Sequence, residues 1–368
     1  MGLLGLIALA APPGTHWEVE TVAENGAGLR APMVIAPDDA IHTVWHSKRE
    51  GRLVHAWKYP ETEWFTEEVV SGRGKGVAPG LGRGPSGNLH ILAFHQGRST
   101  LVHFRKEPGT RWREEDVSLV KGVAGDVKVV VDASGVVHGA YVDSFRGVYV
   151  HVWKSPGGEW DAEYIDQSAM APHDLVLAPD GTLHAGFRSE GNGYFKHAWK
   201  KPGMDGWAAR VVFLAVAEGH GLSLAAGSGG DVWAAFRTPA APGTLSLWLG
   251  KGEQGRRWAS EIVVEGAGWG GGHALDVTQA GVIHLSHMAF NRVVHQWRKE
   301  GGDWEVLEGP SDAKFPSAHL SLALDAEGNP QVFVSTFGNT LHRVWLTTPP
   351  EVDGLLKALP VPTPPASP

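Results

Sequence analysis

The sequence predicts an all-β fold, a seven-bladed β-propeller of four-stranded antiparallel blades that is closed by the N-terminal strand in the last blade. The first observation is a tryptophan that recurs at spacings of 46 to 51 residues, at Trp17, Trp64, Trp112, Trp160, Trp207, Trp258 and Trp304. The second is that the intervals hold only strand and turn signals, punctuated by many of the 49 glycines and 24 prolines. A period in the forties supplies one four-stranded propeller blade.

Each repeat is expected to run through strands A, B, C and D. In residues 178–207, "APDGTLHAGFRSEGNGYFKHAWKKPGMDGW", strand B is TLHAGF and strand C is YFKHAWK, and turns containing Asp-Gly and Pro-Gly flank them. The same phrase recurs in residues 38–64 and 134–160. Strand D begins at or beside the recurring tryptophan.

The two ends of the repeat predict how the ring closes. Trp17 precedes any A, B or C strand, whereas the last unit has an A strand (LSLALD), a B strand (QVFVST) and a C strand (TLHRVW) but no D strand. Residues 16–22 therefore complete the last blade, which removes exposed sheet edges.

The propeller is expected to span residues 14–348, between an N-terminal segment (1–13) and a proline-rich tail (349–368). The apolar run from Leu3 to Ala11 ends in small residues and proline, as in a secretory signal, although no Lys or Arg precedes it. An ordinary apolar tail is the alternative, and the run is too short to span a membrane. This segment predicts an extracytoplasmic protein, and we expect a monomer.

Charge and cysteine content exclude several classes of function. A net charge of −8 argues against nucleic-acid binding, which needs a basic surface. The absence of cysteine excludes disulfides, thiolate metal sites and cysteine nucleophiles.

Paired histidines mark strands B and C of five blades. The B-strand members recur three residues after the turn, and in four blades the C-strand partner follows 13 residues later. A feature repeated at the same depth in five blades is expected to be structural, with buried imidazoles that satisfy polar groups. Equivalent ligand sites between blades are the alternative. The pairs are His42 and His55, His90 and His103, His138 and His151, His184 and His197, and His284 and His295.

Departures from the repeat are better candidates for a functional site. Four consecutive blades have a histidine at the start of strand A, namely His173, His220, His273 and His319, of which His319 is one residue out of phase. Strand A lines the channel, and the D-to-A connections share one face with the B-to-C loops. The four imidazoles are therefore expected near one mouth of the channel.

Arginines in or beside the B-to-C loops are the second departure. They occur in six blades, at Arg49, Arg52, Arg98, Arg146, Arg188, Arg237 and Arg292. Such residues are often solvated surface charge, but together they predict a cationic mouth, and guanidinium groups bind carboxylates and sulfates in a bidentate manner. Arg188 and Arg237 are taken as ligand-binding candidates together with the four histidines.

Residues 180–200 (DGTLHAGFRSEGNGYFKHAWK) and 86–106 (SGNLHILAFHQGRSTLVHFRK) resemble BNR-type, sialidase-like propeller repeats, and are distantly similar to propeller polysaccharide lyases of the ulvan lyase type. The resemblance covers residues 16–347, but the sialidase Asp box is absent. Resemblance to the lyases implies a histidine that binds the uronate, a tyrosine or histidine that takes the C5 proton, and arginines that hold the carboxylate. Of the tyrosines in the repeats, only Tyr194 is expected near the mouth, so the catalytic pair is not assigned.

The preferred hypothesis is recognition of an anionic, uronate-bearing glycan at the mouth. A polysaccharide lyase or hydrolase that acts on acidic glycans is one alternative, and a protein-interaction scaffold is another. A third is a metalloprotein, since carotenoid-cleaving oxygenases hold iron with four histidines on a propeller axis and His173, His220, His273 and His319 match that count. No cofactor beyond such a divalent metal is predicted.

Overall fold

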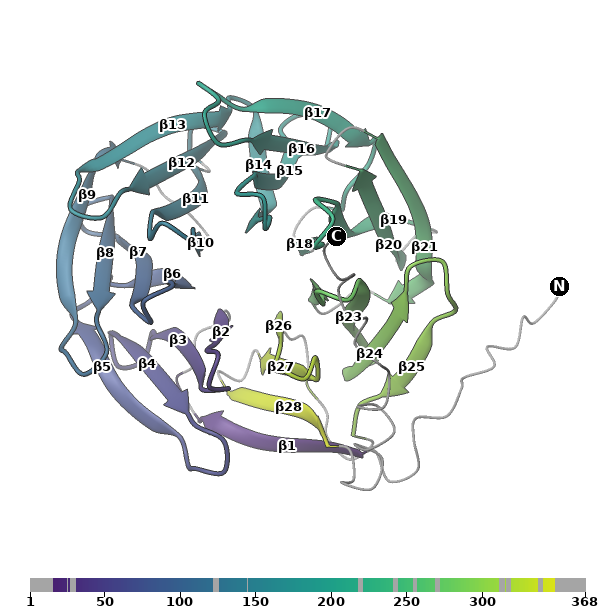
Figure 1. The fold of residues 1–368 in the computed structure, drawn as a ribbon, viewed down its shortest axis with the longest axis horizontal. Coiled ribbons are helices and arrows are strands. Elements are labelled where there is room, and N and C mark those ends of the chain that lie inside the picture. The colour runs from purple at the N-terminus through teal and green to yellow at the C-terminus, as the bar shows by residue number, and fades with distance from the viewer. Residues whose placement is uncertain are drawn as a thin grey trace, which may run out of the picture.

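The computed structural model is a ring of seven four-stranded antiparallel sheets, which confirms the predicted fold (Figure 1). The structure describes residues 16–24, 26, 31–121, 126–143, 145–217, 221–240, 244–253, 257–268, 272–310, 315, 319–336 and 340–347. The predicted segments 1–13 and 349–368 and the candidate His220 lie outside these residues. Among the residues that are described, no helix has the length and apolar character needed to cross a membrane.

Strands follow each other in every blade from the channel outward, in the order A, B, C, D. Blade 1 contains β2 (Met33–Ile35), β3 (Ile41–Ser47), β4 (Arg52–Lys58) and β5 (Phe65–Ser71); blade 2, β6 (Val77–Arg83), β7 (Leu89–His95), β8 (Thr100–Lys106) and β9 (Arg113–Lys121); blade 3, β10 (Lys128–Val131), β11 (Val137–Asp143), β12 (Val148–Lys154) and β13 (Trp160–Asp166); blade 4, β14 (Ala169–Leu177), β15 (Leu183–Ser189), β16 (Phe195–Lys200) and β17 (Ala208–Phe213).

The remaining three blades repeat this order. Blade 5 contains β18 (Leu222–Ala226), β19 (Val232–Pro239), β20 (Thr244–Glu253) and β21 (Arg257–Gly268); blade 6, β22 (His273–Val277), β23 (Val282–Ala289), β24 (Arg292–Lys299) and β25 (Glu305–Glu308); blade 7, β26 (His319–Leu324), β27 (Pro330–Ser335), β28 (Leu341–Thr347) and β1 (His16–Ala23).

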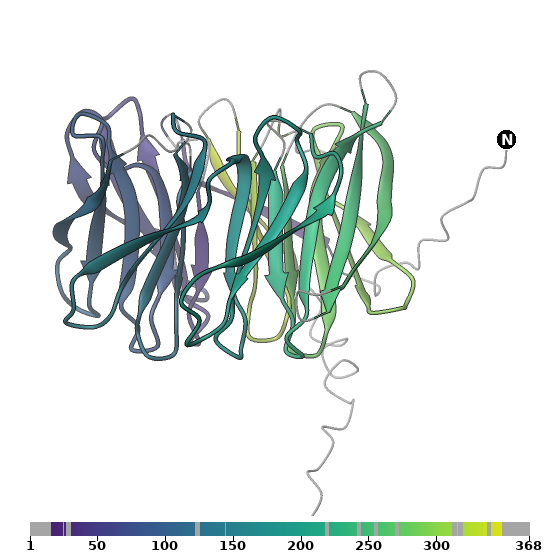
Figure 2. The same cartoon turned by 90° about the horizontal axis from the view of Figure 1, so that it is seen from above.

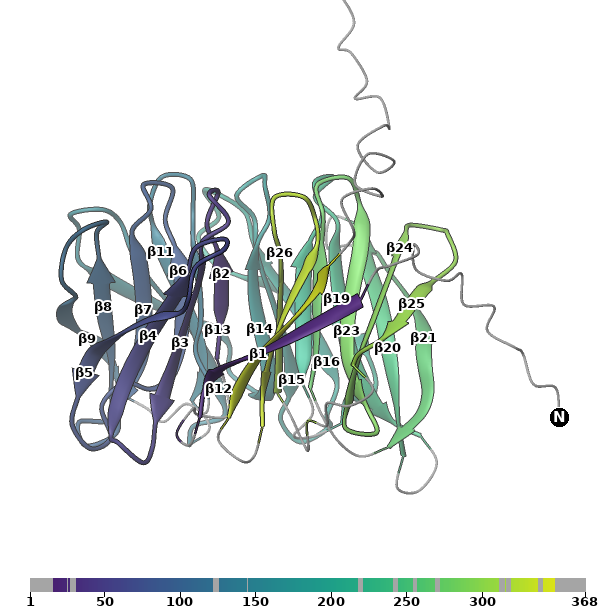
Figure 3. The same ribbon diagram turned by 90° about the horizontal axis from the view of Figure 1, so that it is seen from below.

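The first strand closes the ring as the sequence predicts. β1 pairs antiparallel with β28, from His16 opposite Thr347 to Ala23 opposite Leu341. Figure 3 shows β1 crossing the outer side of the last blade, far along the chain from its partners. The last blade is thus shared between the two ends of the repeat region, which locks the ring without an extra domain.

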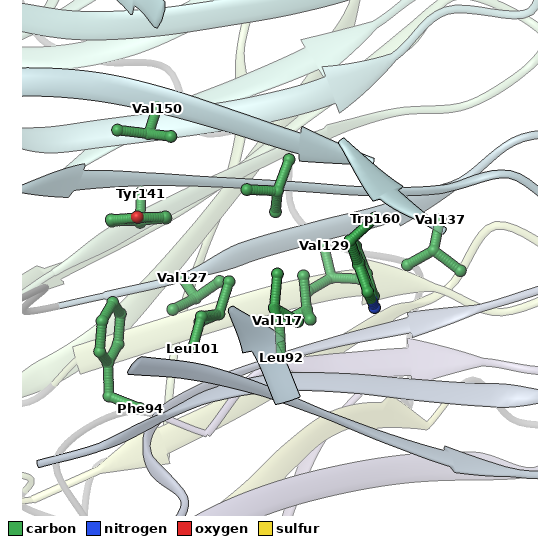
Figure 4. Packing of buried hydrophobic residues seen from close by; sticks show 11 residues of the cluster. Leu92, Phe94, Leu101, Val117, Val127, Val129, Val137, Tyr141, Val150 and Trp160 are labelled. Atoms are coloured by element: carbon green, nitrogen blue, oxygen red, sulfur yellow. The ribbon is translucent and has the colours of Figure 1, made fainter. Parts of the chain in front are cut away.

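Apolar side chains pack between neighbouring blades rather than within one central core. Each of the seven junctions has a buried cluster in which alternate residues of facing strands meet. Figure 4 shows the cluster between blades 2 and 3, where the Phe94 ring meets Tyr141 edge-on at a centroid distance of 5.3 Å. A side chain that points into a junction between blades is therefore buried, whereas the A strands lie beside the channel.

One face of the disc combines the start of strand A with the end of strand B. His319, the first residue of β26, lies opposite Ser335, the last residue of β27, and β22 and β23 run in the same sense. We call this the mouth face. Seen from the side, the blades stand next to each other with loops on the two faces of the disc (Figure 2).

Candidate functional site

The paired histidines of strands B and C hydrogen-bond to each other in all five blades. In blades 1 to 4, Nδ1 of the B-strand ring lies 3.0–3.1 Å from Nε2 of the C-strand ring. In blade 6 the corresponding distance is 3.2 Å. The C-strand rings are almost completely buried. These contacts confirm the burial and hydrogen bonding expected from the sequence, and a structural role stays the prediction.

In blades 1 to 3 a glutamate on strand D extends the pair. Nδ1 of His103 lies 2.7 Å from Glu115 Oε1, and His55 and His151 contact Glu67 and Glu163 in the same way at 2.8 and 2.9 Å. Because a carboxylate only accepts, this Nδ1 donates; Nε2 of the neutral ring then accepts from Nδ1 of the B-strand histidine. We call this chain of two histidines and one glutamate the histidine relay.

The glutamate of each relay also binds the next blade. Glu115 accepts hydrogen bonds from Lys154 Nζ at 2.7 Å and from Trp160 Nε1 at 3.0 Å. Glu67 and Glu163 receive a lysine and a tryptophan of the following blade in the same way. Three of the recurring tryptophans, Trp112, Trp160 and Trp207, therefore bond neighbouring blades to each other, and each relay links its blade to the next.

Ionisation states agree with that role. Burial, reinforced by the neighbouring ring, lowers the pKa of His42 and His138 to about 4 and that of His90 to about 3. The hydrogen bond from His103 lowers the pKa of Glu115 to about 2, against the opposing effect of burial. The imidazoles are therefore neutral and the glutamate ionised at neutral pH.

The candidate site is a cavity of about 380 Å³ in the mouth-side part of the channel. A-strand residues of all seven blades line it, and they include three of the four predicted histidines, His173, His273 and His319. The volume lies within the range of small-molecule sites in proteins. The sequence thus predicted correctly which strand and which end of the channel carry these imidazoles.

Two of these histidines are nevertheless largely enclosed. His173 is 4% exposed and lies 5.1 Å, ring to ring, from Tyr149 of blade 3. His273 is 5% exposed, and its Nε2 donates to the Ala235 carbonyl of blade 5 at 2.9 Å. Each ring thus leans into the junction with the preceding blade while contributing to the wall of the cavity.

His319 has a different orientation, in agreement with its displaced position in the repeat. It pairs with the last residue of its B strand, whereas His273 pairs with His287, two residues before the end of β23. Ser321, two residues further along the same face of β26, donates to the Ala31 carbonyl of blade 1. His319 therefore points toward blade 1 and, being half-buried, is the most accessible of the three.

Sequence reasoning missed Lys128 and the ion pairs that it makes in the cavity wall. Lys128 Nζ lies 3.3 Å from Asp174 Oδ1 and 3.6 Å from Asp126 Oδ2. Asp174 also accepts from the backbone amides of Leu175 and Leu224 at 3.0 and 2.8 Å. Burial raises the pKa of Asp174, against the opposing charge of Lys128. The only available signal was the polar character of Lys128 and Asp174 inside otherwise apolar A strands.

Several loop arginines are neutralised by acids of their own blade. Arg52 contacts Glu50 at 2.6 Å, Arg98 contacts Asp116 at 3.0 Å, and Arg146 and Arg292 lie 3.8 and 3.9 Å from Asp143 and Glu308. Exposed pairs of this kind contribute little to stability. They also reduce the positive potential that the count of arginines predicted for the mouth face.

The two arginines chosen as ligand-binding candidates occupy equivalent positions near the mouth-side ends of β15 and β19. Arg188 is half-buried; its Nε donates to the Val216 carbonyl at 3.3 Å, and its Nη1 lies 3.5 Å from Met170 Sδ. Arg237 is fully buried, at 0% exposure. Neither is among the residues that line the cavity.

The described part of the chain contains no completed site for the metal of the metalloprotein hypothesis. No group of three His, Asp or Glu side chains there is arranged to hold a metal ion. His220, one of the four histidines of that hypothesis, lies outside the described residues.

No protein-family model matches the sequence, and no curated protein matches it either. Solved structures do share its fold. An ulvan lyase, described as representing a new family of polysaccharide lyase, is 12% identical with a TM-score of 0.63, covering 93% of this chain and 99% of its own. The polysaccharide lyase Uly1 is 10% identical with a TM-score of 0.57, covering 89% and 91%.

A fungal fucose-recognising lectin from Aleuria aurantia, a six-bladed propeller, is 12% identical with a TM-score of 0.50 and covers 77% of this chain and 95% of its own. The chain shares its fold with enzymes and lectins alike. At these identities the likeness concerns the fold alone, so the function has to be argued from the site.

Proposed function

We propose that this protein binds an acidic glycan at the channel mouth. The observation that carries the proposal is the cavity of about 380 Å³, whose wall combines His173, His273 and His319 with the cation of Lys128. Imidazoles donate or accept hydrogen bonds near neutral pH. Lys128 adds a positive charge that is already paired with Asp174 and Asp126, so the imidazoles are the main contacts that we propose for an acidic group. The wall also contains the carboxylates of Asp126 and Asp174, the partners of Lys128, and its remaining residues are mainly apolar, as in other small-ligand sites.

Both arginine candidates are part of the proposal, although neither lines the cavity. Arg188 lies at the mouth-side end of β15, where a bound polymer that extends beyond the cavity passes over the junction of blades 4 and 5. Arg237 is enclosed, so it is not a surface contact; its part in the proposal is to hold the junction of blades 5 and 6 below the mouth. His220, next to Gly221 of the cavity wall in the chain, completes the set of candidates.

The fold neighbours support a glycan as the ligand, because two of them are polysaccharide lyases and one is a lectin. As part of the same proposal, the protein acts outside the cytoplasm, in line with the signal-like run from Leu3 to Ala11. The ligand is expected to carry uronate or sulfate groups.

A polysaccharide lyase is the second candidate, favoured by the near-complete coverage of the ulvan lyase. Elimination needs a base for the C5 proton and a cation that neutralises the uronate. All five tyrosines of the sequence are described, and none lines the cavity. In this candidate function His319, the most accessible cavity imidazole, takes the proton and Lys128 neutralises the carboxylate.

An acidic-glycan array, with absorbance of the same mixtures at the unsaturated-uronate band, tests both functions. We expect binding of uronate- or sulfate-bearing glycans, and a loss of about tenfold in affinity, or about 1.4 kcal/mol, in His319→Ala and Arg188→Ala. His220→Ala tests the remaining candidate. His342→Ala, an imidazole on the outer strands that bonds Thr21, is the matched control and is expected to bind like the wild type.

The outcomes separate the functions. Absorbance that grows with time and is lost in His319→Ala identifies a lyase, whereas binding without new absorbance identifies a lectin. Equal binding of neutral glycans contradicts the role of charge. Stoichiometric metal in protein purified without an affinity tag supports the metalloprotein, and wild-type behaviour of all site variants removes the mouth as the functional surface.

A further inference from the structure

Within the part of the chain that the structure describes, Arg237 is a buried cation without a hydrogen-bond partner. Its side chain is completely enclosed, and none of Nε, Nη1 and Nη2 has a hydrogen-bond partner in the described structure. A guanidinium does not lose its proton in a protein. Burial of a charge without compensation is among the most unfavourable arrangements in a folded chain, so the position calls for a counter-ion.

Arg237 faces the junction between blades 5 and 6. Along β19, Trp233 and Ala235 pack into the apolar cluster of this junction, and Arg237 shares their side of the strand. From blade 6, His287 has the same orientation as Leu285, which belongs to the same cluster. Arg237 and His287 are thus on facing sides of one junction.

His273 adds a third basic side chain. It lies directly opposite His287 in the register of β22 and β23, and its Nε2 bonds to Ala235, two residues from Arg237. Burial, followed by the charge of Arg237, lowers the pKa of His287 to about 4. For Arg237 itself, burial lowers the pKa and no acidic neighbour opposes it. Among the described residues, the junction therefore presents a cation and two imidazoles but no carboxylate paired with Arg237.

The equivalent arginine of the preceding blade shows what is missing. Arg188 occupies the same strand position in blade 4, where the Val216 carbonyl accepts from its Nε and Met170 Sδ lies near its Nη1. Arg237 has no such acceptor among the described residues. The residue that faces the arginine from the following blade differs between the two junctions. Phe236 of blade 5 is on the side that faces Arg188, whereas His287 of blade 6 is on the side that faces Arg237.

We propose that a small monovalent anion, a halide or an ion of the size of formate, is bound at the junction of blades 5 and 6 by Arg237 and His287. The guanidinium supplies a fork of N–H donors. His287, whose Nδ1 has only a 3.5 Å contact with the Met288 carbonyl, supplies one more from Nε2 in the tautomer that is protonated there. Since Arg237 is enclosed, the site admits a free ion and excludes a sugar acid. The ion completes the packing of the ring, and this role is independent of glycan binding at the mouth.

Thermal unfolding at constant ionic strength tests the site, with sodium gluconate replaced stepwise by sodium chloride or sodium formate. The wild-type Tm is expected to rise by roughly 2 °C for each tenfold increase in chloride above the dissociation constant. Arg237→Met, which keeps an apolar chain of similar length, is expected to fold and to show no chloride dependence. Arg292→Met removes a half-exposed arginine of blade 6 and is expected to keep the wild-type dependence.

Bromide-soaked crystals give a readout that does not depend on any variant. Anomalous density within hydrogen-bond distance of the Arg237 guanidinium is expected, and its absence together with a Tm that ignores chloride overturns the proposal. Glucuronate that stabilises the wild type but not Arg237→Met also overturns it, because Arg237 then belongs to the glycan site.

A carboxylate of the chain itself is the remaining rival. Glu218 follows Ala217, whose amide donates to the Arg237 carbonyl at 2.8 Å. If chloride has no effect and Glu218→Gln lowers the Tm as Arg237→Met does, the counter-ion is Glu218 and the anion site does not exist. A chloride dependence that persists in Glu218→Gln supports the site.

Discussion

At the residue scale, the same side chain has different roles according to the direction it faces. Histidine is the clearest case. His90 and His103 face a blade junction, bond to each other at 3.0 Å and are buried, so they bear on stability. His319 begins an A strand, lines the cavity and is half-buried, so it is available to a ligand. Only the second kind belongs in a functional proposal.

His138→Ala is expected to lower the free energy of unfolding by about 1 to 3 kcal/mol, because it leaves a buried partner, His151, without its donor. Glycan binding is expected to survive. Chemical denaturation monitored by tryptophan fluorescence measures the change. His95→Ala is the control, because His95 is a half-buried imidazole at the end of a B strand and outside any relay. It is expected to lower the free energy of unfolding by less than His138→Ala does. A binding defect with unchanged stability would show that the relay has a functional role.

At the element scale, β1 repeats two interactions of other D strands although it comes from the opposite end of the chain. Trp17 meets the His295 ring of blade 6 edge-on at 6.0 Å, as Trp160 meets His103 at 5.1 Å. Glu20 accepts from Arg343 Nη1 at 2.8 Å and from Lys58 Nζ of blade 1 at 2.6 Å. This glutamate therefore bonds to a lysine of the following blade, as Glu115 does.

Deletion of residues 16–22 is expected to abolish cooperative unfolding, because β28 loses its outer partner and blade 1 loses a bond to blade 7. Calorimetry measures cooperativity as the ratio of the calorimetric to the van't Hoff enthalpy.

A finer comparison uses two single variants of β1. Glu20→Ala is expected to lower the free energy of unfolding by about 1 to 3 kcal/mol, and Glu18→Ala is its control. Glu18 is exposed and lies 3.6 Å from His16 alone, so its removal is expected to be neutral. Equal effects of the two variants would contradict the role of Glu20.

At the scale of the whole molecule, the repeated histidine pairs make stability depend on pH. Burial keeps the imidazoles neutral in the folded state, with pKa values of about 4 at His42, His184 and His284, whereas the ordinary value is 6.5. When the pH falls below 6.5 the unfolded chain takes up protons that the folded chain does not. The stability that these groups contribute is therefore present above pH 6.5 and is lost between pH 6.5 and about 4.

We expect cooperative acid unfolding between about pH 6 and pH 4. A depression of the pKa from 6.5 to about 4 corresponds to roughly 3 kcal/mol for one imidazole, so a few such groups match the whole stability of a typical domain. Glu67, Glu115 and Glu163, with pKa values of about 2, contribute only below pH 4.5. Tm measured by circular dichroism from pH 8 to pH 4 checks this, and a Tm that stays constant to pH 4 would contradict it.

The sequence by itself determined the number of blades, the order of their strands, the closing role of residues 16–22 and the burial and hydrogen bonding of the paired histidines. These features are local or periodic: strand alternation, turn residues and a repeat of 46 to 51 residues leave few other ways to bury the apolar faces. The start of strand A as the wall of the cavity follows from the same periodicity.

Only the tertiary structure decided which of the polar residues near the mouth are accessible. Arg188 and Arg237 have the same position in the repeat, yet one is half-buried with a carbonyl acceptor and the other is enclosed opposite His287. Burial there depends on the neighbouring blade, whose facing residue lies about one repeat away in the sequence. The ion pairs of Arg98 with Asp116 and of Lys128 with Asp174 have the same origin, since both join residues far apart in the sequence that packing brings within 4 Å, and no local pattern encodes them.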